Sequence, residues 1–302
     1  MKNIQLILAF TIIILCLRCS DEDAMLMPKQ EFFPHTDLEN SGNWILKETV
    51  SDEFEAANLD EDKWLIQGRA GVYQSNFIGR APAQFSTDNV RIEDGKLKLE
   101  TRWDPDFPFS GEIQTYGNGD SYHYENITTA AVISKSTFLY GYMEIKCKVA
   151  DASVTSSFWM TGNQSELDVF EFLGKPKQQH KKHLEKEYKF SIHDWSPAVG
   201  GKTVWTDKYE LDWRMADGFH IYACDWSANG LSFYADGELI RSATIAEIEA
   251  ESTSNTSGSA WVLNKALRIW VDSETFPWHG LPVEQDLPVD YEVEYIRVWQ
   301  KK

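Results

Sequence analysis

The sequence predicts an all-β fold, a β-sandwich of two antiparallel sheets. Turn-forming residues recur at short intervals, and the segments between them are short and rich in aromatic and β-branched side chains. No long helix is indicated, and the one helix-like region is 175–189. The chain has 302 residues, which is enough for one large sandwich, and it shows neither an internal repeat nor a second domain boundary.

Composition restricts the classes of function. The chain carries 47 acidic and 29 basic side chains, a net charge of −18, which argues against a general nucleic-acid binder because that class needs a basic surface. It also has 12 Trp, 12 Tyr and 16 Phe, which form strands and offer faces on which sugar rings stack. We therefore expect no nucleic-acid partner, and the aromatic content suits a glycan.

Residues 1–19 are predicted to be a signal peptide. Lys2 precedes an almost wholly apolar run over 4–17, which has the length of a signal-peptide core and is short for a membrane span. Cys19, followed by acidic residues, resembles the junction of a bacterial lipoprotein, and an ordinary secretory signal is the alternative. Either interpretation places the protein outside the cytoplasm. With Cys19 lipidated, it would lie at the cell surface as an outer-membrane lipoprotein, and the lipid would be its only membrane contact.

The remaining segments follow in order along the chain. Residues 20–43 are polar without periodicity and are predicted to be a tether, so the folded domain is predicted to occupy 44–302. A loop at 79–85 leads into a hairpin whose turn contains Asp94 and Gly95. Apolar and polar residues alternate over 141–149, which is typical of an antiparallel strand with one buried face. Further strands are expected at 89–92, 95–100, 130–134, 156–160, 165–172, 190–195, 219–226, 231–237, 267–271 and 292–299.

Two cysteines remain in the predicted domain, Cys147 and Cys224, each within a predicted strand. They could pair in an oxidising compartment or remain as buried thiols, and their separation in sequence does not decide between these alternatives. Neither has neighbours in sequence that indicate a metal site.

Three carboxyl groups fall within six residues of the strand predicted at 165–172, those of Glu166, Asp168 and Glu171. Side chains alternate between the two faces of a strand, so Glu166 and Asp168 share a face while Glu171 comes one position late. A β-bulge between Asp168 and Glu171 would point all three the same way. Acids crowded on one face raise at least one pKa, which suits glycoside hydrolysis by two carboxyls. The alternative is an exposed acidic edge strand without a chemical role.

The motif Glu-Leu-Asp-Val-Phe-Glu at 166–171 resembles the signature of glycoside hydrolase family 16, in the bulged form typical of its agarases, porphyranases, carrageenases and laminarinases. The Gly79-Arg80 loop and the Phe-Pro-Trp-His-Gly segment at 276–280 resemble the agarase and porphyranase branch in particular. The resemblance covers most of the chain after about residue 44. It implies a jelly roll whose concave sheet carries the substrate cleft.

By this resemblance Glu166 is the nucleophile and Glu171 the general acid and base, while Asp168 between them adjusts charge and proton position. The pKa of Glu171 is expected to be high because Asp168 and Glu166 are close to it. His193 is expected to contact this group and the substrate, with a purely structural role as the alternative. Trp159, in the preceding strand, is expected to form a platform for a sugar ring.

Other candidate substrate contacts are aromatic or cationic. Trp270, Trp278 and His279 form a second aromatic group, although core packing explains Trp270 equally well. Arg69 and Arg80 could contact hydroxyl or sulfate oxygens, or they could be solvated surface residues. The lysines of 175–189 are interpreted as a solvated loop face, with sulfate contacts as the alternative if they line the cleft.

The resemblance implies a secreted, endo-acting, retaining hydrolase of β-1,4 linkages in red-algal galactans, with agarose weighted slightly above porphyran and hybrid chains. Two alternatives stay open, a laminarinase-type endo-β-1,3-glucanase and a non-catalytic glycan-binding surface lipoprotein. No cofactor is required for this chemistry. A structural calcium ion is left open without assigned ligands, because Glu294 stands where an Asp is common in the family. We expect a monomer whose partner is the polysaccharide.

Overall fold

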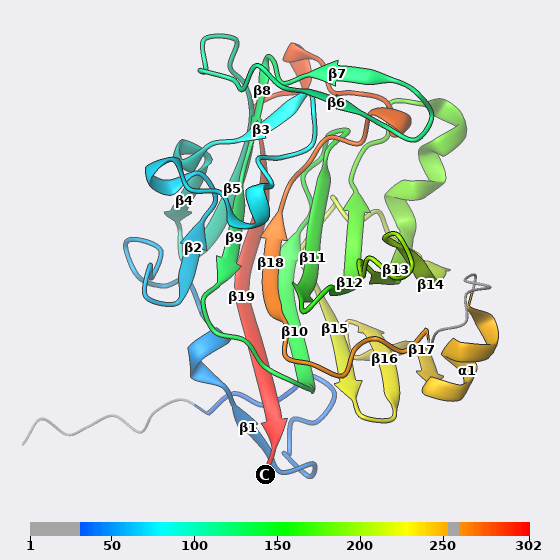
Figure 1. The fold of residues 1–302 in the computed structure, drawn as a ribbon. Coiled ribbons are helices and arrows are strands. Elements are labelled where there is room, and N and C mark those ends of the chain that lie inside the picture. The colour runs from blue at the N-terminus through cyan, green and yellow to red at the C-terminus, as the bar shows by residue number, and fades with distance from the viewer. Residues whose placement is uncertain (1–30, 253–259) are drawn as a thin grey trace, which may run out of the picture. The chain divides into compact units, whose positions relative to one another are not determined.

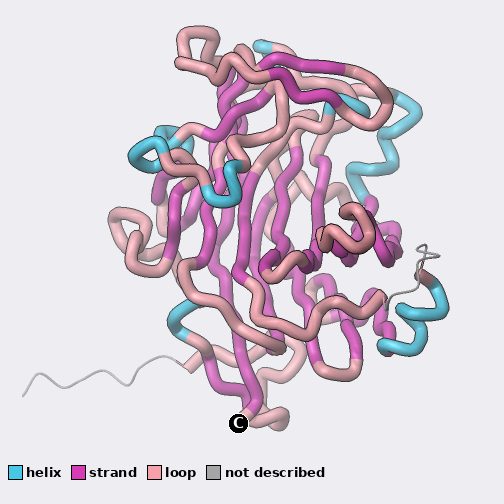
Figure 2. The backbone as a smooth tube through the Cα atoms, viewed as in Figure 1, coloured by secondary structure: helices cyan, strands magenta, loops and turns pink. Residues whose placement is uncertain are grey.

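The computed structural model describes residues 31–252 and 260–302 (Figure 1). Its folded unit, Phe33–Lys302, consists mostly of strands, which Figure 2 shows in magenta. The predicted all-β sandwich is confirmed. The predicted signal peptide, including Cys19, lies outside the described residues.

Ten of the described strands form the first sheet: β1 (Trp44–Leu46), β3 (Ala83–Phe85), β4 (Val90–Glu93), β5 (Lys96–Trp103), β8 (Ile127–Thr129), β10 (Gly141–Lys148), β15 (His220–Ser227), β16 (Gly230–Ala235), β17 (Glu238–Thr244) and β19 (Val289–Lys301). Their order is β17-β16-β15-β10-β19-β5-β8-β3, with β1 beside β19 and β4 beside β5. Neighbouring strands are antiparallel apart from β3 and β8, which form a short parallel pair that the sequence did not predict.

Seven of the described strands form the second sheet: β2 (Trp64–Ile66), β9 (Ala131–Ser134), β11 (Thr155–Gly162), β12 (Ser165–Leu173), β13 (Glu187–Asp194), β14 (Lys202–Glu210) and β18 (Arg268–Asp272). Their order is β14-β13-β12-β11-β18-β9-β2, so the acidic strand β12 lies near the centre. A separate hairpin is formed by β6 (Ile113–Thr115) and β7 (Ser121–His123). Figure 1 shows this hairpin above the end of the second sheet.

Helices are short. The helix-like region predicted at 175–189 is a 3-10 helix, η5 (Gln179–Lys186), and the chain then enters β13, which pairs with β12 and β14. An unpredicted α-helix, α1 (Ile245–Glu251), begins after Thr244, which forms a capping box with Glu247. The other 3-10 turns are η1 (Glu48–Val50), η2 (Arg69–Gly71), η3 (Gln74–Asn76), η4 (Thr87–Asn89), η6 (Pro277–His279) and η7 (Glu284–Asp286). Across residues 31–252 and 260–302, no helix combines the length and apolar character needed to cross a membrane.

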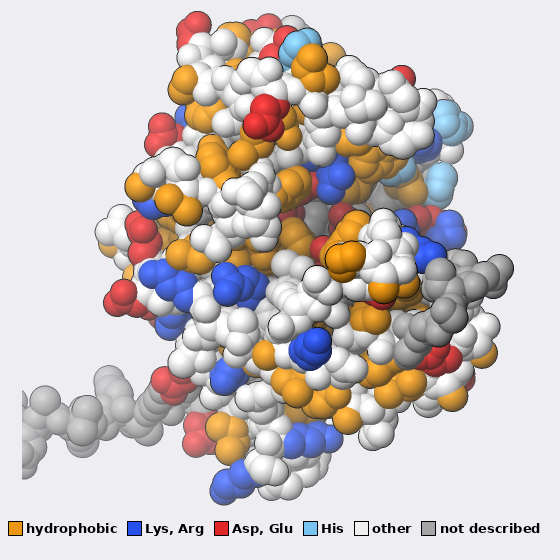
Figure 3. All heavy atoms as spheres, in the orientation of Figure 1, with side chains coloured by type: hydrophobic (Ala, Val, Ile, Leu, Met, Phe, Trp, Pro, Cys, Tyr) orange, Lys and Arg blue, Asp and Glu red, His pale blue; other side chains and the backbone are white. Residues whose placement is uncertain are grey.

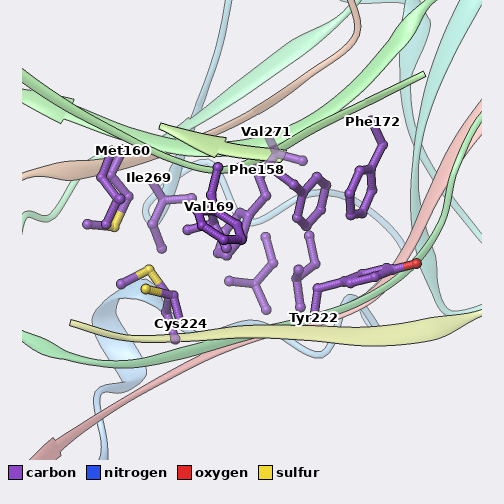
Figure 4. Packing of buried hydrophobic residues seen from close by; sticks show 14 of the residues in the cluster. Phe158, Met160, Val169, Phe172, Tyr222, Cys224, Ile269 and Val271 are labelled. Carbon is purple, nitrogen blue, oxygen red and sulfur yellow. The ribbon is translucent and has the colours of Figure 1, made fainter. Parts of the chain in front are cut away.

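The apolar core lies between the two sheets (Figure 4). Because side chains alternate along a strand, Phe158 and Met160 of β11 enter this core while Trp159 between them points to the opposite face of the sheet. The core residues labelled in Figure 4 are Phe158, Met160, Val169, Phe172, Tyr222, Cys224, Ile269 and Val271. Their burial fixes which face of the second sheet is left for a ligand.

The two cysteines of the domain are buried free thiols. Cys147 lies on β10 opposite His220, and Cys224 lies on β15 opposite Met143. The two thiols are therefore several residues apart along neighbouring strands and do not pair. The structure decides this question, which the sequence left open.

The residues before Trp44 fold onto the first sheet. The His35 backbone N–H donates to Oε2 of Glu144 at 2.9 Å, and the Trp44 ring lies 5.8 Å from that of Tyr142. Tyr142 and Glu144 are consequently only 2% and 1% exposed, although the alternating pattern of β10 predicted them on a solvent-facing side. The folded unit thus begins at Phe33, so the last part of the predicted tether belongs to it.

Candidate active site

The carboxyl motif on β12 contains the predicted bulge. Phe158 of β11 lies opposite Phe170, but the next residue, Trp159, lies opposite Asp168, so Val169 is the extra residue. Val169 and Phe170 are both fully buried. Glu171 therefore returns to the face of Asp168, and Glu166, Asp168 and Glu171 all line one cavity. The predicted common orientation of the three acids is confirmed.

Three cross-strand rows supply side chains to this cavity, and every residue of the rows except Ser157 lines it. Directly opposite residues on neighbouring strands share a face and lie about 5 Å apart. Each row takes one residue from β12, one from β11 and one from β18, which lie side by side in Figure 1. The rows are Glu166–Thr161–Arg268, Asp168–Trp159–Trp270 and Glu171–Ser157–Asp272.

The cavity has a volume of about 630 Å³, which is the size range of small-ligand sites. Figure 3 shows this side of the molecule, with a hollow in which acidic side chains are visible. Besides the rows, the walls include Gln74, Phe77, Arg80, Asn163, Trp195 and Glu274.

The three motif carboxyls have a raised affinity for protons. Burial, and then the neighbouring Asp168 carboxyl, raise the pKa of Glu171 to about 7. Burial, and then the Asp168 charge, raise the pKa of Glu166 to about 8, and burial raises the pKa of Asp168 to about 7. The high pKa predicted for Glu171 is thus supported, with burial as a larger cause than the neighbouring charges.

His193 lies on β13 opposite Glu166 and contacts the motif as predicted. Its Nε2 is 2.8 Å from Oδ2 of Asp168, and its Nδ1 is 3.1 Å from the Thr203 hydroxyl. Its ring stacks on Trp195 at 5.4 Å, and the Trp195 indole N–H donates to Oε2 of Glu166 at 2.9 Å. His193 and Trp195 therefore hold the first two acids of the motif in place.

A fixed cation lies beside Glu171. The Arg80 Nε donates to Oε2 of Glu274 at 2.5 Å, and both residues line the cavity. The guanidinium carbon lies 5.0 Å from the ring centre of Phe276 and 5.7 Å from that of Trp278. The carboxylate and the rings together hold the positive charge of Arg80 at the cavity wall.

Trp159 occupies the position expected for a sugar platform. It is half-buried and lines the cavity, and its ring stacks on Trp270 with centroids 4.7 Å apart and an interplanar angle of 29°. Trp270 is only 2% exposed but also contributes to the cavity wall. Ile269 and Val271 on either side of it enter the core between the sheets, so Trp270 is buried on the cavity face, against Trp159 and Phe77. Of the two alternatives for Trp270, the structure therefore supports a place at the site.

Several predicted substrate contacts do not line this cavity. Arg69, the first residue of η2, is exposed and pairs with Glu61 at 2.8 Å. Trp278, in η6, packs against Phe276 and Arg80. Burial lowers the pKa of the neighbouring His279 to about 4, which leaves its imidazole neutral. None of the lysines of 175–189 lines the cavity, and some of them have partners elsewhere, among them Lys177 with Asp286 and Lys181 with the Trp278 carbonyl.

Among the cavity residues that the sequence did not predict, four carry a charged or indole side chain: Trp195, Arg268, Asp272 and Glu274. Arg268 and Asp272 alternate with Trp270 along β18, so placing Trp270 at the site would have placed both on the same face. Trp195 directly follows the strand that carries His193. Glu274 had no local signal, because its contact with Arg80 joins residues 194 positions apart.

Side chains that could hold a metal ion come together at the acid motif. Within the described residues, the one group of three that comes within 4.8 Å is Glu166, Asp168 and His193, which is the acid motif itself. Glu294, considered for calcium, pairs with Lys146 at 2.6 Å. Calcium therefore remains without an assigned site.

Comparison with known proteins agrees with this geometry. The model of the beta-porphyranase A-D GH16 domain matches residues 44–301. Beta-porphyranase B of Zobellia galactanivorans is 25% identical over 98% of this chain and 96% of its own length. In fold, the chain is similar to a beta-porphyranase from the human gut bacterium Bacteroides plebeius, with a TM-score of 0.66, 23% identity, and coverage of 85% of this chain and 91% of that one. It is also similar to the laminarinase catalytic domain from Thermotoga maritima, with a TM-score of 0.63, 22% identity, and coverage of 86% and 99%. The chain therefore belongs to glycoside hydrolase family 16, in the group described by the porphyranase A-D domain.

Proposed function

We propose that this glycoside hydrolase cleaves internal β-1,4 linkages in a red-algal galactan of the porphyran or agar type, with retention of anomeric configuration. The observation that carries the proposal is the bulged strand β12, which directs three carboxyls into one cavity. Beside them lies the Trp159 ring stacked on Trp270, which we call the aromatic shelf. A protein that only binds glycans has no need of three crowded, mutually repelling carboxyls, of which Asp168 is buried and Glu166 and Glu171 are half-buried, because this arrangement destabilises the fold.

In the proposed reaction Glu166 attacks the anomeric carbon while Glu171 gives its proton to the glycosidic oxygen. The glycosidic bond breaks, the leaving sugar departs as an alcohol, and a glycosyl ester with Glu166 remains. Water then gives a proton to Glu171 and displaces Glu166, which restores both groups. The pKa of about 7 for Glu171 suits proton donation near neutral pH. Attack requires the ionised form of Glu166. Burial and the Asp168 charge raise the pKa of Glu166 to about 8, and the contacts with His193 and Trp195 act in the opposite direction and favour ionisation.

The cations of the cavity support a sulfated or partly sulfated substrate. Arg80 lies beside Glu171, and Arg268 lies in the row of Glu166. Guanidinium groups bind sulfate and hydroxyl oxygens through several donors at once. The sequence slightly favoured agarose as the substrate. These two arginines, together with the match to the porphyranase group, favour porphyran or hybrid chains instead.

The test is a depolymerisation panel of porphyran, agarose, carrageenans and laminarin, with Glu171→Gln as the inactive control. We expect oligosaccharides from porphyran or agarose and none from laminarin, and the first product should carry the β-anomer by NMR. Release from laminarin alone would instead support a β-1,3-glucanase. Binding without hydrolysis would support a glycan-binding lipoprotein, and an α-anomer as the first product would exclude the two-step reaction.

We also propose that the protein works at the cell surface, held by a lipid on Cys19. This proposal rests on the apolar run at 4–17 and on the acidic residues after Cys19.

A further inference from the structure

A fourth carboxyl, that of Asp272, faces the cavity and has no part in the reaction proposed above. It ends β18, is 1% exposed and contributes to the cavity wall. In the register of the sheet it lies opposite Ser157, which lies opposite Glu171 on its other side. Asp272 and Glu171 therefore lie on either side of Ser157 on the same face of the sheet, and the charge of Glu171 acts on Asp272.

Asp272 also holds the edge of the aromatic shelf. The Trp159 indole Nε1–H donates to Oδ2 of Asp272 at 3.0 Å. One face of the same indole rests on Trp270 at 4.7 Å. Trp159 is therefore fixed in two directions, by stacking on one face and by a hydrogen bond at its edge. Since its N–H is already used, the indole offers a sugar a ring face and no donor.

The surroundings of Asp272 favour its neutral form. Its Oδ1 is buried and has no hydrogen-bond partner among the described residues. Burial, followed by the negative charge of Glu274 and by that of Glu171, raises the pKa of Asp272 well above its usual value, while Trp159 and Arg80 act in the opposite direction. An anion at this position would be compensated by one indole hydrogen bond and by the charge of Arg80, which is itself paired with Glu274.

We propose that Asp272 is a positioning residue, which acts as an uncharged acceptor that locks the Trp159 indole into a rigid shelf beside Glu171. The inference rests on the function proposed above, because the shelf matters only when a sugar ring lies on it. Because Asp272 fixes the Trp159 indole before the substrate binds, binding does not have to order this side chain. Loss of the hydrogen bond should therefore weaken substrate positioning more than the chemical step.

The test compares two nearly isosteric substitutions in the full chain. Asp272→Asn keeps an uncharged acceptor for the indole, whereas Asp272→Leu removes the acceptor. With the polymer cleaved by the wild type, we expect Asp272→Asn to keep kcat/KM within about threefold and to leave the pH profile unchanged. Asp272→Leu should raise KM about tenfold or more with a smaller effect on kcat. In a Trp159→Phe background, which lacks the indole N–H, Asp272→Leu should add little further loss.

A second measurement does not depend on activity. The indole N–H signal of Trp159, assigned by its absence from the Trp159→Phe spectrum, should exchange slowly with solvent in the wild type and in Asp272→Asn. It should exchange faster in Asp272→Leu. Equal damage by Asn and Leu would show that the charge is needed and would overturn the proposal, as would an exchange rate unchanged in Asp272→Leu. A wild type without hydrolase activity would refute the proposed function, and the exchange measurement would still decide the role of Asp272.

Discussion

Arg80 and Glu274 form an ion pair across 194 residues of sequence, with Nε and Oε2 2.5 Å apart. The pair lies at the wall of the acid-lined cavity, where Glu274 is 5% and Arg80 28% exposed at the side chain. Burial raises the pKa of the Glu171 carboxyl, and the positive charge of Arg80 acts in the opposite direction. The proton affinity of the proposed general acid is therefore a balance between burial and Asp168 on one side and Arg80 on the other.

The first prediction concerns the pH dependence of this acid. Glu171 must be protonated for the first step, so kcat/KM should fall as the pH rises through about 7. Arg80→Gln removes the nearby cation, keeps a donor for Glu274 and should move this alkaline limb to higher pH. The matched control is Arg69→Gln, because Arg69 is exposed and pairs with Glu61 outside the cavity. An alkaline limb that does not move in Arg80→Gln would contradict the balance described above.

The second prediction concerns the two outer acids. Glu166→Gln and Glu171→Gln should each lower kcat by about three orders of magnitude or more and still bind oligosaccharide, because geometry is kept and only the reactive carboxyl is lost. Asp168→Asn should lose less. Steady-state kinetics and calorimetric binding measure both effects. Near-normal activity of either Glu variant on the natural polymer would refute the role assigned to that residue.

A third prediction concerns stability. A carboxyl whose pKa is raised in the folded state favours folding below its usual pKa, and this advantage is lost as the pH rises through the folded value. For Glu171 the loss occurs between about 4.5 and about 7. Glu171→Gln should therefore unfold less readily than the wild type at pH 8, by on the order of 1–3 kcal/mol, and show no such advantage at pH 4.

Denaturant unfolding at the two pH values measures this difference. Glu55→Gln, at an exposed carboxyl, is the control and should show no pH-dependent gain. A Glu171→Gln variant that is equally or less stable than the wild type at pH 8 would show that burial of this carboxyl is not costly.

The fourth prediction separates two tryptophans that the sequence treated alike. Trp159→Ala should weaken oligosaccharide binding by about 1 kcal/mol, because it removes the exposed half of the shelf. Trp278→Ala should mainly lower thermal stability, because Trp278 packs against Phe276 at 4.6 Å and Tyr116 at 5.5 Å and does not line the cavity. Affinity measurements and melting curves on both variants test this. The reverse pattern would restore the binding role first predicted for Trp278.

The fifth prediction concerns location. Cys19→Ala should release the protein from the membrane fraction, because the proposed lipid is its only anchor. Cys16→Ala, three residues earlier, is the control and should leave the protein bound. Mass spectrometry of the mature N-terminus identifies the modified residue. Membrane association that persists in Cys19→Ala, without a lipid adduct, would contradict the proposed anchor.

The sequence by itself determined the sandwich and the chemistry of its central strand. Alternation along 141–149 and the spacing of Glu166, Asp168 and Glu171 are local patterns, and the two-residue period of a strand converts them directly into faces. The same period required a bulge before Glu171, and the bulge is there. The family resemblance could also be seen in the sequence, because the motif at 166–171 is contiguous in the chain.

The tertiary structure decided which distant residues complete the site. The pairing of β11 with β18 brings Asp272 into the row of Glu171, and local pattern does not reveal which strands become neighbours. Arg69 and Arg80 look equivalent in the sequence, yet one faces solvent with Glu61 and the other is held at the cavity by Glu274. The reason is physical: the period of a strand is set by its own backbone, whereas strand order and ion pairing are set by packing between segments far apart in the chain.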